Sequence, residues 1–100
     1  MFIILLRFSE NSDQAGTFMA GHNQWIKNGF EDKVFLMAGS LQPGLGGTVL
    51  AHGESRDALQ IRINADPFVA HKVVTAEILE IEPKKTDERL NFMLTEPEKL

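Results

Sequence analysis

The sequence predicts an α+β protomer of the ferredoxin-like type, with its elements in the order βαββαβ. Three apolar runs of strand length, at residues 2–8, 34–41 and 73–81, are separated by segments of helical character. A glycine-rich connection joins the second run to a further strand at residues 48–52. In this topology the strands form one antiparallel sheet, and both helices cover the same face of it.

Length and composition limit the functions that the chain can have. It has 100 residues, of which 43% are hydrophobic and 24% are charged, as in ordinary globular domains. The formal net charge of -4 leaves no basic surface for a phosphate backbone, so we expect no nucleic-acid partner. There is no Cys for a disulfide, and the opening apolar run ends at Arg7, too early to cross a bilayer. We therefore expect a cytoplasmic protein with no membrane partner.

The first strand and the first helix are both indicated by their apolar patterns. Residues 2–8 read FIILLRF, a continuous run that suits a central strand covered on both faces. From about residue 13 to Gly29, apolar residues recur at spacings of three and four, which is one stripe of an amphipathic helix. We expect Asn11 or Ser12 to cap this helix and Gly29 to end it.

The second helix is predicted over residues 56–64. Ser55 suits its N-cap, and Asp57 places a negative charge in its first turn. Its apolar residues also alternate as in a strand, but the bond between Asp66 and Pro67 marks a helix end.

The last strand and the C-terminal extension complete the organisation. The domain is predicted to span residues 1–83, and residues 84–100 form a charged extension, either a short helix or a tail that covers the partner protomer. The first and last strands carry apolar side chains on both faces, whereas the helices cover only one. We therefore expect a homodimer in which two sheets pack face to face as a dimeric α+β barrel.

No motif for phosphate, dinucleotide or zinc binding is present in the sequence. The glycines at residues 44–47 suit a hairpin loop rather than a cofactor site. The three histidines, His22, His52 and His71, are not at ligand spacing on one helix, so we expect no metal site. We also expect no cofactor.

His22 is the candidate for chemistry, because it lies in the apolar stripe of the first helix and should face the sheet. A lone histidine there is more commonly structural, with its ring nitrogens satisfied by a carbonyl or by water. An acid-base role needs a carboxylate that fixes one nitrogen, because imidazole, with an unperturbed pKa of about 6.5, can then exchange protons near neutral pH. Asp66 is the natural partner, although an Asp before Pro can equally form a turn that only ends a helix.

These residues resemble the YCII-related domain family of small dimeric α+β barrel proteins. The resemblance covers residues 2–83 and is carried by His22, by Ala38-Gly39, by Asp66-Pro67-Phe68-Val69 and by Ile81-Glu82-Pro83. It implies a ferredoxin-like protomer that pairs sheet to sheet. It also implies an acid-base dyad of His22 and Asp66 in a cleft beside the barrel.

The chain departs from the family pattern at two positions. The hairpin reads Ala38-Gly39-Ser40-Leu41 where the family often has Gly-Pro-Leu, so we expect Ser40 to alter the floor of the pocket. His71 falls where the family usually has a small residue, and we expect it on the surface rather than at the site.

The resemblance leaves the substrate open, because few members have an assigned reaction. If His22 is a general base, it would remove a proton next to a carbonyl or from a phenolic hydroxyl, followed by isomerisation or elimination without a cofactor. Phe18, Trp25 and Phe68 are expected to wall an apolar pocket for a ring, although aromatic residues at this spacing are more often core.

Two main hypotheses follow for the function. The first is a cofactor-independent lyase or isomerase that acts on a small cyclic or carbonyl compound. The second is a non-catalytic dimeric module that binds a small molecule or a partner protein. A monooxygenase-like barrel that oxidises a quinol without a cofactor would use the same pocket.

Overall fold

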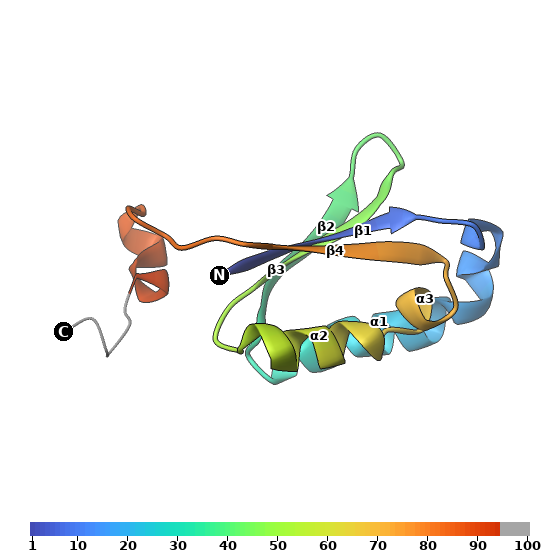
Figure 1. The fold of residues 1–100 in the computed structure, drawn as a ribbon, viewed down its shortest axis with the longest axis horizontal. Coiled ribbons are helices and arrows are strands. Elements are labelled where there is room, and N and C mark those ends of the chain that lie inside the picture. The colour runs from blue at the N-terminus through green and yellow to red at the C-terminus, as the bar shows by residue number, and fades with distance from the viewer. Residues whose placement is uncertain (95–100) are drawn as a thin grey trace.

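A computed structural model of the protein describes residues 1–94 (Figure 1). It confirms the predicted βαββαβ order and contains one four-stranded antiparallel sheet in the order β2-β3-β1-β4. The strands are β1 (Phe2–Phe8), β2 (Phe35–Leu41), β3 (Gly46–Ala51) and β4 (Val74–Glu80). The helices are η1 (Ser12–Gln14), α1 (Ala15–Glu31), α2 (Arg56–Asn64), α3 (Pro67–Ala70) and η2 (Glu88–Met93).

The core lies between the sheet and helices α1, α2 and α3, which all lie on one side of it (Figure 1). Alternate residues of β1, namely Phe2, Ile4 and Leu6, point toward the helices and are buried. Leu59 and Ile63 of α2 meet them and are fully buried. Period-two burial in the strand and period-four burial in the helix therefore build one core, as the apolar patterns predict.

The N-terminal boundary of α1 differs from the prediction. The short helix η1 precedes it, and neither Asn11 nor Ser12 caps α1; its N-cap is Gln14, whose side chain makes no capping hydrogen bond. The Asn11 side chain instead donates to the backbone oxygen of His71 at 3.0 Å. This residue therefore ties the start of the helical layer to the turn before β4.

The prediction that Gly29 ends α1 is wrong, because the helix continues to Glu31. Gly29 is buried, and a Cβ atom at this position would overlap the ring of Phe35 on β2. The glycine is required by the close approach of α1 to the sheet, not by a left-handed helix end.

Helix α2 has the predicted bounds, and the predicted cap is present. The Ser55 side chain accepts a hydrogen bond from the backbone nitrogen of Ala58 at 3.1 Å. The chain after α2 differs from the prediction, because the four-residue helix α3 begins at Pro67, with Asp66 as its N-cap. Asp66 therefore follows the end of α2 and also begins α3 as its N-cap.

Arg62 of α2 connects the two long helices. Its guanidinium donates to Glu54 at 3.0 Å and to Asp32, just after α1, at 3.1 Å. The hydrogen bond with Glu54 is the main cause that raises the pKa of Arg62 above its usual value. The Arg62 backbone oxygen accepts the indole N–H of Trp25 at 2.8 Å, which satisfies this buried donor.

The other face of the sheet carries an apolar row that no described helix covers. Met37, Leu50, Ile3 and Leu79 lie side by side across the four strands, as the pairing register shows. Met37 is 45% exposed and Leu79 is 40% exposed. The expectation of an uncovered apolar sheet face is therefore met in the single chain.

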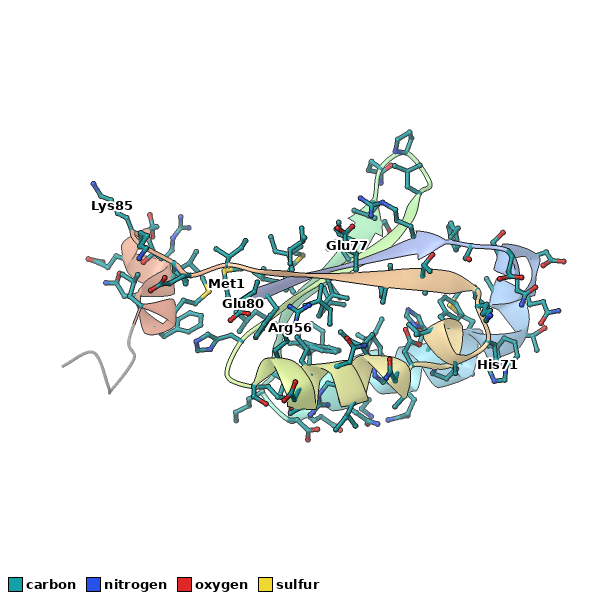
Figure 2. The ribbon with its side chains drawn as sticks, viewed as in Figure 1. Met1, Arg56, His71, Glu77, Glu80 and Lys85 are labelled. Atoms are coloured by element: carbon teal, nitrogen blue, oxygen red, sulfur yellow. The ribbon has the colours of Figure 1, made fainter. Side chains whose placement is uncertain are left out.

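The chain leaves the sheet after β4 as an extended arm that ends in η2, beyond the end of the sheet (Figures 1 and 2). The Asp87 carboxylate caps η2, and the ring of Phe92 packs edge-on against His52 at 5.5 Å. The predicted extension thus contains a short helix, and its residues 95–100 lie outside the described residues. No helix within residues 1–94 has the length and apolar character needed to cross a bilayer.

Two glycine substitutions test the close approach of α1 to β2. We expect Gly29→Ala to lower the free energy of unfolding by about 1–3 kcal/mol, because the added methyl group must displace Phe35. Gly16→Ala in the same helix meets open space and should raise it by about 0.5–1 kcal/mol. Urea denaturation measures both values, and a stabilising Gly29→Ala would contradict the observed packing.

Candidate active site

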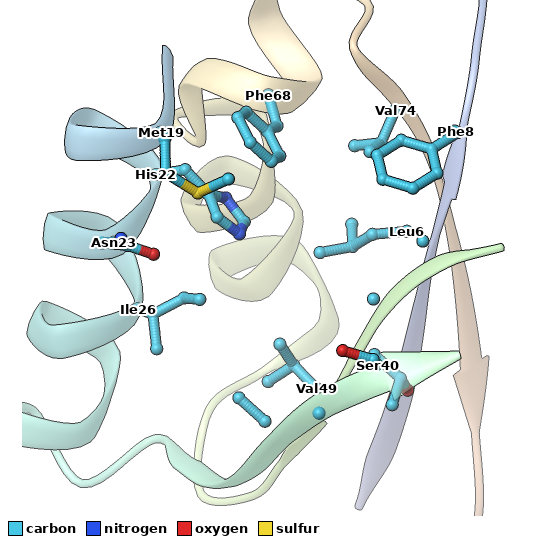
Figure 3. A pocket seen from close by; sticks show the side chains of 15 residues that line it. Leu6, Phe8, Met19, His22, Asn23, Ile26, Ser40, Val49, Phe68 and Val74 are labelled. Carbon is cyan, nitrogen blue, oxygen red and sulfur yellow. The ribbon is translucent and has the colours of Figure 1, made fainter. Parts of the chain in front are cut away.

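A cavity of about 320 Å³ lies between α1 and the sheet. Figure 3 shows α1 on one side of it and the strands on the other. Leu6 and Phe8 of β1 and Val74 of β4 lie on its sheet side, and Phe68 of α3 closes one end. Most of the lining is apolar, and the volume is at the small end of the range for ligand sites. The cavity therefore suits one small ring.

His22 lies on the wall of this cavity and contacts Asp66, the N-cap residue of α3. Its Nδ1 atom is 2.8 Å from Oδ1 of Asp66. The His22 side chain is 12% exposed, and the Asp66 side chain is fully buried. An ionised carboxylate can only accept hydrogen bonds, so with Asp66 ionised the Nδ1 atom donates the hydrogen. The other ring nitrogen, Nε2, has no hydrogen bond within residues 1–94 and is available to a bound molecule.

The position of Asp66 is fixed by the backbone around it. Its φ and ψ angles of -66° and 123° are extended, as the following Pro67 requires. Oδ1 accepts the backbone N–H of Phe68 at 3.0 Å in addition to the His22 hydrogen. Asp66 therefore caps α3 and contacts the imidazole with the same oxygen atom, so the predicted pairing with His22 and the predicted turn are both present.

The second carboxylate oxygen of Asp66, Oδ2, is buried and has no hydrogen-bond partner within the described residues. An unsatisfied buried acceptor lowers stability. Such groups are rare in native structures, and a bound water, an ion or a catalytic role can each account for one. A helix cap does not by itself require this burial, since the exposed Asp87 caps η2 with the same geometry.

Two aromatic rings hold the imidazole in its orientation. The Phe68 ring stacks on His22 with a centroid distance of 4.0 Å and an interplanar angle of 5°. Trp25 lies one turn further along α1, with its ring centroid 5.9 Å from that of His22. Its other side packs edge-on against Phe35. The imidazole can therefore rotate little without breaking a stacking contact.

Two of the four residues predicted to form the pocket line the cavity, and two do not. Phe68 and Ser40 line the cavity. Phe18 and Trp25 do not: Phe18 stacks on the exposed His71 with a centroid distance of 4.0 Å, and Trp25 belongs to the core. An apolar stripe does not tell which of its members faces a cavity and which faces packed side chains.

Other lining residues were missed from the sequence. Met19 and Ile26 lie three residues before and four residues after His22, so they share its side of α1 and line the cavity with it. That spacing was the signal that could have found them. Asn23, which also lines the cavity, gives no such signal, because it lies outside the stripe.

Each of the three histidines contacts a different partner. His52 contacts Phe92 and His71 contacts Phe18, whereas His22 contacts Asp66. Within residues 1–94 there is no group of three His, Asp or Glu side chains that could hold a metal ion.

Comparisons with known proteins support the fold. No protein-family model matches the chain. No curated protein matches it either. Among solved structures, the chain is similar to 5-chloro-2-hydroxyhydroquinone dehydrochlorinase (TftG) from Burkholderia phenoliruptrix AC1100, in a complex with 2,5-dihydroxybenzoquinone. The TM-score is 0.65 and the sequence identity 13%, over 81% of this chain and 93% of that chain.

This similarity bears on the architecture alone. It supports the α+β fold of dimeric barrels that the sequence predicts. The resemblance to the YCII-related family, inferred from sequence motifs, is supported only at the level of the fold, because no family model matches the chain.

The two aspartates that cap short helices allow a matched test of the site. We expect Asp66→Ala to lower the free energy of unfolding by about 1–3 kcal/mol, because it leaves the donors of His22 and Phe68 without an acceptor. Asp87→Ala removes the same cap from η2 at a position exposed to water and should have a smaller effect. Equal effects in thermal and urea unfolding would contradict the buried network.

Proposed function

We propose that this protein is a cofactor-independent lyase or isomerase that acts on a small cyclic or carbonyl compound. The observation that carries this proposal is the contact of 2.8 Å between His22 and Asp66 in the wall of an apolar cavity. A histidine whose Nδ1 is held by a buried carboxylate can use Nε2 as a general base. The cavity is large enough for one ring.

The reaction begins when Nε2 of His22 removes a proton from a carbon next to a carbonyl or from a phenolic hydroxyl. The electron pair of the broken bond enters the conjugated system of the substrate. In an elimination, this pair expels a leaving group as an anion from the neighbouring carbon. In an isomerisation, the imidazolium returns the proton to a different carbon. Neither route transfers electrons to or from the protein, so the proposed chemistry needs no redox cofactor.

Asp66 acts as a positioning residue in this proposal. It keeps the hydrogen on Nδ1, so that Nε2 is the nitrogen that accepts the substrate proton. It also stabilises the imidazolium that forms, because a buried carboxylate interacts strongly with a positive charge at this distance. The similarity to TftG supports a reaction on an oxygenated ring, because that enzyme is named for its action on a chlorinated hydroxyhydroquinone.

We further propose that the protein is a homodimer that pairs through the uncovered face of the sheet. The row of Met37, Leu50, Ile3 and Leu79 gives each protomer the same apolar surface, which is what a two-fold interface requires. The fold is that of dimeric α+β barrels. A second copy would remove this row from water.

Paired lysine substitutions test the dimer. The wild-type protein is expected to sediment at twice the chain mass of 11.2 kDa. Met37→Lys combined with Leu79→Lys should give a folded monomer, because both side chains are exposed in the single chain and would place charges in the interface. Ile61→Lys on α2, where the side chain is 72% exposed, is the control and should remain dimeric. A dimeric double variant would contradict this interface.

Substitution of His22 tests the catalytic proposal. On a panel of chlorinated hydroxyquinols and small lactones, we expect wild-type turnover of at least one compound, and His22→Gln should lower kcat/KM about a hundredfold or more. His71→Gln is the matched control, because His71 does not line the cavity. Both steady-state rates and compound binding are measured. Binding without turnover by the wild-type protein would favour the non-catalytic binding module instead.

A further inference from the structure

Asn23 directly follows His22 on α1, and its side chain also extends toward the cavity (Figure 3). Asn23 is an exposed residue of the cavity lining, and its amide makes no hydrogen bond with any described residue. The other two amide side chains of α1 are paired, since Gln24 donates to Asn28 at 2.9 Å. Asn23 is therefore the amide of this helix that is free to bind a molecule in the cavity.

Few polar side chains line the cavity, and their distribution is uneven. His22 and Asn23 lie on the α1 side, and Ser40 lies on β2 across the cavity (Figure 3). The hydroxyl of Thr48 also belongs to the lining but donates to the backbone oxygen of Ile4 at 2.9 Å. In a site with mostly apolar walls, a small number of polar groups fixes the orientation of the ligand. A ligand that satisfies these groups carries polar atoms at opposite edges.

We propose that Asn23 is a substrate-binding residue that donates its amide hydrogen to the substrate oxygen on which negative charge develops when His22 removes the proton. This inference rests on the proposed function and deepens it. The substrate class that it names is a compound with a single ring and a hydroxyl or carbonyl oxygen at the His22 and Asn23 edge. A second polar group of the ring lies at the Ser40 edge.

The chemistry of an amide suits this role. Asn23 is neutral and keeps its hydrogens throughout, so it stabilises the developing charge without taking part in proton transfer. A hydrogen bond to an anionic oxygen is stronger than one to a neutral oxygen, so the interaction grows as the proton leaves. Donors of this kind, placed where charge develops, are a major source of catalysis in sites shielded from water.

The test uses two ring compounds that differ in one group, 4-nitrophenol and 4-nitrotoluene, with the full-length protein. Bound phenolate is followed by its visible absorbance, and affinities by calorimetry. We expect wild-type protein to bind 4-nitrophenol with an increased phenolate fraction. Asn23→Leu should weaken 4-nitrophenol binding about tenfold to a hundredfold and lower that fraction, while binding of 4-nitrotoluene changes little.

Control variants separate the possible outcomes. Asn28→Leu removes an amide from the same helix outside the cavity and should bind both compounds as the wild-type protein does. Asn23→Asp keeps the shape but replaces the donor by a negative charge, and should reduce phenolate binding further. Circular dichroism verifies that each variant is folded.

The inference and the proposed function fail in different ways. If 4-nitrophenol binds equally well to the wild-type protein and to Asn23→Leu, while His22→Gln lowers the phenolate fraction, the role of Asn23 is overturned and the dyad stands. If the wild-type protein binds neither compound, the substrate class named here is overturned. If it also turns over no compound of the panel above, the proposed function itself is overturned.

Discussion

The hydrogen bond between His22 Nδ1 and Asp66 Oδ1 joins two parts of the chain that are 44 residues apart. It depends on Pro67, which keeps Asp66 extended, and on the N–H of Phe68, which binds the same oxygen. Phe68 then stacks on the imidazole that Asp66 holds. One carboxylate therefore sets the start of α3, the orientation of His22 and the end wall of the cavity. The free Nε2 nitrogen and the proposed acid-base chemistry follow from that arrangement.

Small residues of β2 and β3 leave room for the cavity beneath α1, among them Gly39, Ser40 and Gly47. Ser40 of β2 pairs with Gly47 of β3, and Gly47 pairs with Leu6 of β1, so a side chain at position 47 would enter the cavity. Toward the other end of the sheet, α1 approaches β2 so closely that Gly29 meets Phe35. The helix thus packs tightly at one end and leaves room for a ring at the other. No residue of the extended arm or of η2 lines the cavity.

Apolar periodicity predicted β1, as a continuous run, and α1, as one stripe. It did not predict α2, whose apolar residues alternate as in a strand; the cap at Ser55 and the stop at Asp66-Pro67 identified that helix. Apolar periodicity also predicted the uncovered sheet face. It did not predict α3, which is too short for a helical period, or the extent of α1, because the role of Gly29 depends on a contact with another element. The pairing of His22 with Asp66 was predicted from residue type and local position. The places of Trp25 in the core and of Asn23 in the cavity lining depend on the tertiary packing of α1, which its sequence pattern does not show.

The tautomer of His22 is the most direct test of this account, because a general base at Nε2 requires the hydrogen on Nδ1. Long-range ¹H–¹⁵N correlation spectra of the imidazole distinguish the two neutral forms. We expect the Nδ1–H form in the wild-type protein, and its replacement by the Nε2–H form in Asp66→Leu, where the acceptor of the Nδ1 hydrogen is gone. A wild-type protein with the hydrogen on Nε2 would contradict the account, because that nitrogen could not then accept a proton from a bound substrate.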